Sequence, residues 1–120
     1  MKLIPLVFVV LVAYSYSAAI FAHGLLERAT PAAGSTVHGS PAEVKLFFSQ
    51  TLEPAFSTLR VLDANAKQVD RQDQTVDATD ARALRVSLQP LAPGAYRVIW
   101  RVLSKDGHVT QGDLSFTVAP

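Results

Sequence analysis

Apolar and polar residues alternate along much of the chain after residue 23, with a period of two residues. This period is typical of strands that bury one face and expose the other. The alternation is clearest over residues 44–48, 59–61, 84–88, 96–102 and 114–118. No stretch of ten or more residues has the 3.6-residue period of an amphipathic helix. The pattern therefore predicts an all-β fold.

Short turn motifs rich in Pro, Gly, Asn and Asp separate these segments, because such residues supply backbone angles that a strand cannot use. They occupy residues 31–34, 39–41, 63–65, 90–94 and 106–107. The spacing predicts about seven short strands in an immunoglobulin-like or cupredoxin-like Greek-key β-sandwich. Tyr96 and Trp100 share the apolar side of one strand, so we expect both in the core. The hydroxyl of Tyr96 should bond back to the preceding turn.

The first 22 residues follow another pattern. Lys2 precedes an apolar run over residues 3–13, which polar residues interrupt from position 14. A membrane-spanning helix needs about 20 apolar residues, so this run is too short. A positive start, a short apolar run and small residues at the end are typical of a secretory signal peptide. We therefore expect residues 1–22 to be a cleaved signal peptide and residues 23–120 to form one periplasmic domain.

The cleavage site decides which residue begins the mature protein. Cleavage after Ala22 makes His23 the first residue. Cleavage after Ala19, with Ser17 three residues from the cut, leaves three residues ahead of His23. Both sites end in alanine, and the cleavage pattern alone does not choose between them.

Composition removes several classes of function. The chain has eleven Lys and Arg against ten Asp and Glu, and Lys2 leaves with the signal peptide. A chain without a basic surplus is a poor binder of nucleic acid or of anionic membranes. There are no cysteines, which excludes thiolate zinc sites, iron–sulfur clusters and blue-copper centres. Five Asp between residues 63 and 80 lack the spacing of a calcium loop, so we assign them to a hairpin and a loop.

Three histidines remain as candidates for metal chemistry. His108 follows Asp106 with one glycine between them, and in an extended segment side chains two residues apart point the same way. If His23 begins the mature chain, its amine and imidazole can chelate one ion. Together these groups offer three nitrogens and one oxygen, a donor set that suits Cu(II). His38 lies between two turns, and we expect it to be an exposed loop residue.

The order of short motifs resembles the copper resistance proteins of the CopC type. The residues that carry the resemblance are Ala22-His23-Gly24, Thr30-Pro31-Ala32-Ala33-Gly34, Phe48-Ser49, the segment from Pro93 to Val102, and Ser104-Lys105-Asp106-Gly107-His108 with Gly112. The resemblance spans the whole mature chain and favours cleavage after Ala22. It implies a protein that is not an enzyme and that holds one Cu(II) at His23, Asp106 and His108.

The resemblance also sets further expectations. Some members of the family have a glutamate near the copper where this chain has the neutral Gln50. Some have a second, methionine-rich Cu(I) site, which this chain lacks because its only methionine is Met1. The family implies a role as a copper carrier or buffer in resistance, with a CopD-type inner-membrane copper transporter as a candidate partner. We expect a monomer.

Two other functions compete with this interpretation. Lytic polysaccharide monooxygenases also hold copper with an N-terminal histidine and a second histidine on a β-sandwich. A charged Asp106 at the metal would occupy a position that oxygen chemistry needs open, which argues against that enzyme. The other alternative is an immunoglobulin-like scaffold that binds no metal.

Overall fold

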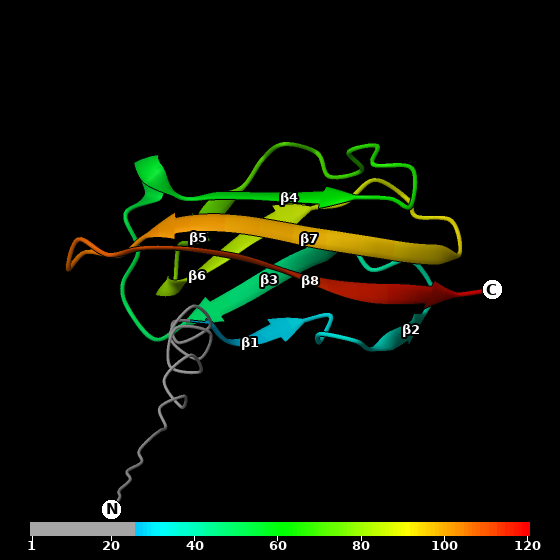
Figure 1. Ribbon diagram of the computed structural model, residues 1–120, viewed down its shortest axis with the longest axis horizontal. Coiled ribbons are helices and arrows are strands. Elements are labelled where there is room, and N and C mark those ends of the chain that lie inside the picture. The colour runs from blue at the N-terminus through cyan, green and yellow to red at the C-terminus, as the bar shows by residue number, and fades with distance from the viewer. Residues whose placement is uncertain (1–25) are drawn as a thin grey trace, which may run out of the picture.

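The computed structural model describes residues 26–120 as a sandwich of two four-stranded sheets (Figure 1). The first sheet has the order β1-β3-β6-β5 and the second has the order β2-β8-β7-β4. The strands are β1 (Leu26–Thr30), β2 (Thr36–His38), β3 (Glu43–Phe48), β4 (Thr58–Leu62), β5 (Thr75–Asp77), β6 (Asp80–Ser87), β7 (Gly94–Leu103) and β8 (Val109–Ala119). A short 3-10 turn, η1 (Pro54–Phe56), links β3 to β4.

The predicted all-β sandwich is confirmed, with eight strands in the described residues where about seven were expected. β2 and β5 have only three residues each, too few to show an alternation in sequence. The predicted signal peptide and His23 lie outside the described residues. Over residues 26–120, no helix has the length and hydropathy that crossing a membrane requires.

The core lies between the sheets and consists of the inward residues of the alternating segments. Trp100 is 2% exposed and meets Phe48 edge to face, with 6.4 Å between ring centroids. Tyr96 stacks on Phe116 at 5.6 Å. The Tyr96 hydroxyl donates a hydrogen bond to the carbonyl of Ala92 at 2.5 Å. The expected core positions of Tyr96 and Trp100, and the bond to the preceding turn, are therefore confirmed.

The Asp-rich segment is structural, as expected. Asp70 is 1% exposed, and its carboxylate accepts hydrogen bonds from the backbone amides of Val61 and Gln72 at 2.8 Å each. The other four carboxylates accept backbone N–H groups of nearby turns or strands, and they are Asp63, Asp73, Asp77 and Asp80. These aspartates therefore fix turns and tie loops to strands, and within residues 26–120 they do not form a metal-binding cluster.

The β7–β8 hairpin is the longest unit of the fold. Its strands pair in continuous register from Gly94 opposite Val118 to Leu103 opposite Val109. The hairpin ends in residues 104–108, at the same end of the sandwich as η1 (Figure 1). A backbone bridge between Leu52 and Ser104 ties this end to the segment that follows β3. Residues 104–108 are thus held at the tip of a long, well-paired hairpin.

Candidate metal centre

A tight turn at residues 104–108 builds the candidate site. The amide of Ser104 donates to the carbonyl of His108 at 3.0 Å, and the amide of Gly107 donates to the carbonyl of Ser104 at 2.9 Å. Gly107 has φ +95°, a left-handed conformation that glycine adopts without the steric cost of a Cβ. The Asp-Gly pair therefore serves the turn and allows the chain to reverse within four residues.

This turn brings Asp106 and His108 together. The Nδ1 atom of His108 lies 3.2 Å from Oδ1 of Asp106, and the backbone amide of His108 also approaches that oxygen. The predicted convergence of the two side chains is confirmed. Its cause differs from the expectation, because the residues lie in a hairpin turn and not in an extended strand.

The buried Ser104 holds the turn through hydrogen bonds to Asp106 and His108. It is 1% exposed, and its hydroxyl donates a hydrogen bond to the carboxylate of Asp106 and lies 3.3 Å from the carbonyl oxygen of His108. The Ser104 hydroxyl, followed by the side chain and amide of His108, lowers the pKa of the Asp106 carboxyl below its ordinary value. The carboxylate is therefore ionised at neutral pH and available to a cation. The sequence placed Ser104 in a motif but gave it no role.

Lys105 fixes the turn to the neighbouring segment. Its amide donates to the carbonyl of Thr51 at 2.8 Å, and its Nζ lies 3.8 Å from a carboxylate oxygen of Glu53. Glu53 therefore lies beside the turn in a solvent-exposed ion pair with Lys105. The segment that follows β3 thus braces the backbone of the site.

The two candidate ligands remain open to solvent. The side chain of His108 is 79% exposed and that of Asp106 is 47% exposed. Within residues 26–120 no three His, Cys, Asp or Glu side chains cluster as a metal site requires. The described residues thus offer two donors, and His23, the third predicted ligand, lies outside them.

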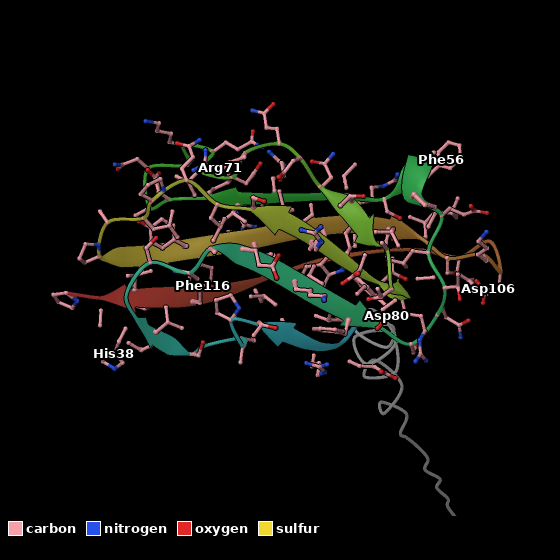
Figure 2. The ribbon with its side chains drawn as sticks, turned by 180° about the vertical axis from the view of Figure 1, so that it is seen from behind. His38, Phe56, Arg71, Asp80, Asp106 and Phe116 are labelled. Carbon is pink, nitrogen blue, oxygen red and sulfur yellow. The ribbon has the colours of Figure 1, made fainter. Side chains whose placement is uncertain are left out.

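Two other residues are placed by the structure. His38 is exposed at the end of β2, at the opposite end of the sandwich from Asp106 (Figure 2). Gln50 is exposed two residues beyond β3, in the segment that reaches Ser104 through Leu52. His38 therefore takes no part in the candidate site, as expected, whereas Gln50 lies on the same end of the molecule as the site.

Comparisons with known proteins add a family relationship. A model described as the CopC domain matches residues 26–119. Copper resistance protein C of Xanthomonas campestris pv. juglandis is 35% identical over 117 residues, covering 92% of this chain and 91% of that protein. The crystal structure of CopC from Methylosinus trichosporium OB3b superposes with a TM-score of 0.75 at 41% identity, covering 82% of this chain and 95% of that chain.

One longer relative matches this chain over only a part of its own length. The copper transport protein CutJ of Bacillus subtilis is 27% identical over 99 residues. The match covers 82% of this chain but spans only 18% of the length of CutJ.

Proposed function

This chain belongs to the CopC family, and from that premise we propose that it is an exported, periplasmic protein that carries or buffers one Cu(II) ion in copper resistance. Members of this family are copper-binding proteins and not enzymes, and the chain is one of them. The observation that carries the proposal is the pairing of Asp106 with His108 at 3.2 Å on an exposed, braced hairpin tip.

The third ligand in this proposal is His23, and its support is the short sequence distance between His23 and β1. Leu26 pairs with Phe48 at the end of β3, and Leu52 bridges to Ser104 four residues later. His23 precedes Leu26 by three residues, so its Cα lies within about 11 Å of the Leu26 Cα. Cleavage after Ala22 would place an amine and an imidazole in that range.

The donor set favours Cu(II) over its competitors. Two imidazoles, an amine and a carboxylate make a nitrogen-rich site completed by oxygen, without thiolate, which suits Cu(II). Zinc has no particular need of an α-amine. Cu(I) prefers soft thioethers, and the only methionine of the chain is Met1. We therefore propose one Cu(II) per chain and no methionine site for Cu(I).

The proposal also extends to partners. CutJ, whose name describes it as a copper transport protein, contains a segment similar to this chain within a much longer protein. This arrangement supports a membrane copper transporter of the CopD type as the partner that receives or supplies the ion. We propose that the copper protein itself acts as a monomer.

The decisive test adds one glycine ahead of His23 in the mature protein. The extra residue moves the amine away from the imidazole and leaves every side chain in place, so Cu(II) affinity should fall by orders of magnitude. Affinity is measured by competition against a chelator of known strength, and electron paramagnetic resonance should show a single nitrogen-rich signal of type 2. His108→Ala should weaken binding with the fold intact, and the exposed His38→Ala should change nothing. Equal affinity with and without the added glycine would mean that the amine is not a ligand.

A further inference from the structure

The outward face of the second sheet concentrates arginines. Arg60 lies directly opposite Ile99 in the β4–β7 pair, and Arg97 and Arg101 flank Ile99 two residues away on β7. With Thr58, Gln111 and Asp113 these residues line a shallow depression of about 350 Å³. We refer to the outward side chains of Arg60, Arg97, Ile99 and Arg101 as the arginine face. Arginine is enriched at protein interfaces and among the residues that contribute most to binding.

The arginine face has more positive charge than the fold neutralises. Arg97 pairs with Asp113 at 2.9 Å, but within residues 26–120 no carboxylate lies within 4 Å of Arg60 or Arg101. Residues 1–25 contain no Asp or Glu that could serve. Arg60 and Arg101 therefore lack an ion-pair partner in this chain.

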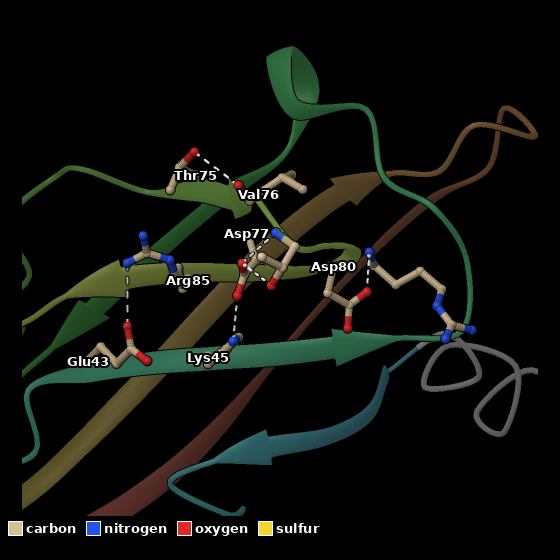
Figure 3. Close-up of polar contacts among 9 residues, drawn as sticks. Glu43, Lys45, Thr75, Val76, Asp77, Asp80 and Arg85 are labelled. Carbon is tan, nitrogen blue, oxygen red and sulfur yellow. Dashed lines mark hydrogen bonds and ion pairs between the residues drawn. The ribbon is translucent and has the colours of Figure 1, made fainter.

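The first sheet shows the opposite arrangement on its outward face. Lys45 pairs with Asp77 at 2.5 Å, and Arg85 pairs with Glu43 at 3.5 Å (Figure 3). A third cation of this face, Arg28, has no carboxylate of the described residues within 4 Å but lies over the ring of Phe47, 3.6 Å from its centroid. The arginine face therefore has two guanidinium groups, those of Arg60 and Arg101, that are free to bind carboxylates from outside.

The arginine face leads directly to the candidate metal centre. Leu103 and Val109 are the last pair of the β7–β8 ladder before the turn at residues 104–108. Val109 is 51% exposed, and Phe56 on η1, at the same end of the molecule as Asp106 (Figure 2), is 64% exposed. They are the large hydrophobic side chains most exposed in the described residues. A molecule seated on the arginine face and on these apolar residues would lie beside Asp106 and His108.

We propose that the arginine face is the docking surface for a protein that presents a cluster of carboxylates. Guanidinium groups bind carboxylates with two parallel hydrogen bonds, which provide both orientation and specificity. A surplus of about two positive charges is too small for anionic lipids, whose recognition takes clusters of about 4–8 basic residues. The proposed docking surface does not depend on metal binding. Transfer of copper to the docked protein, in contrast, rests on the proposed function.

The experiment uses the metal-free mature protein and a hexaglutamate peptide as the probe. At low ionic strength, amide NMR signals of β4, β7 and the first half of β8 should shift on titration, and salt should reverse the shift. The double variant Arg60→Glu/Arg101→Glu should bind the peptide at least tenfold more weakly. The matched control Lys67→Glu/Arg82→Glu makes the same change of charge at two exposed residues away from the arginine face, and it should retain the affinity within about twofold. An equal loss of peptide affinity in both variants would mean that binding depends only on net charge, and this would overturn the proposal.

Two further measurements exclude other occupants. Binding of the wild type to vesicles of anionic and neutral phospholipid, lost in Arg60→Glu/Arg101→Glu, would overturn the proposal in favour of a membrane surface. A concentration-dependent dimer in sedimentation velocity, lost in the same variant, would overturn it in favour of a second copy of the chain. Cu(II) affinity and thermal stability of the variant should match the wild type. Failure of the copper proposal therefore leaves the docking result intact, and the reverse also holds.

Discussion

Gly112 lies directly opposite Trp100 in the β7–β8 ladder, where an added methyl group has no room. A Cβ at this position would lie 2.7 Å from Cζ2, 3.1 Å from Cη2 and 3.2 Å from Cε2 of the Trp100 indole. The indole is 2% exposed and packs against Phe48, so it cannot move away without disturbing the core. Overpacking of this kind costs about 1–3 kcal/mol. Replacing glycine also lowers the conformational entropy of the unfolded chain, which stabilises the fold by about 0.4–1 kcal/mol. The net effect of Gly112→Ala should therefore be a loss of about 1–2 kcal/mol in the free energy of unfolding.

A double-mutant cycle with Trp100→Phe isolates this contact. The smaller ring removes the benzo atoms that meet the new methyl group, so Gly112→Ala should cost little in the Trp100→Phe background. The coupling energy should then be on the order of 1–2 kcal/mol, in the range found for residues in contact. Urea unfolding followed by circular dichroism measures it through the shift of the midpoint at constant slope. An equal loss in both backgrounds, or none in either, would refute the steric argument.

Three further predictions follow from single contacts. Tyr96→Phe removes the hydrogen bond to the carbonyl of Ala92 and should lower the free energy of unfolding by about 0.5–1.5 kcal/mol, measured in urea. Ser104→Val preserves burial but removes the donor to Asp106, so Cu(II) affinity should fall in chelator competition while thermal stability changes little; unchanged affinity would deny Ser104 a role. The pKa of Asp106 is lowered in the folded state, so its contribution to stability is present above the unfolded-state pKa of about 3.9 and is lost as the pH falls through the lower folded value. Melting curves from pH 7 to pH 2 should therefore show a steeper acid loss for the wild type than for Asp106→Asn, and parallel curves would contradict this.

The sequence predicted best those strands whose inward residues form the core. In 44–48, 59–61, 84–88, 96–102 and 114–118, the apolar set of each alternation is the set that the structure buries. The strands that were not identified in advance are β1, β2 and β5. None of these strands contains a fully buried residue. They form because they pair with neighbouring strands, and their own sequences carry no apolar periodicity. An edge strand of this kind cannot be recognised without knowing which strand lies beside it.

The candidate site was predicted in part, for a related reason. The spacing of Asp106 and His108 correctly indicated that their side chains converge. Spacing alone did not reveal that a left-handed Gly107 closes a turn between them, or that Glu53 forms an ion pair with Lys105 beside the turn. The arginine face could not be predicted from the sequence either. Which charges find partners depends on register across three strands, and no single strand contains that information.

Ser104 shows how the fold and the candidate site are physically joined. The inward positions of β7 run through Tyr96, Val98, Trp100 and Val102, and the next position in the same period is Ser104, which is equally buried. A buried hydroxyl must find a hydrogen-bond partner or destabilise the fold. Here the carboxylate of Asp106 is that partner. The periodicity that fills the core thus ends in a polar residue that the core holds rigidly. The position of the Asp106 carboxylate is consequently set by the packing of the sandwich as well as by the exposed turn.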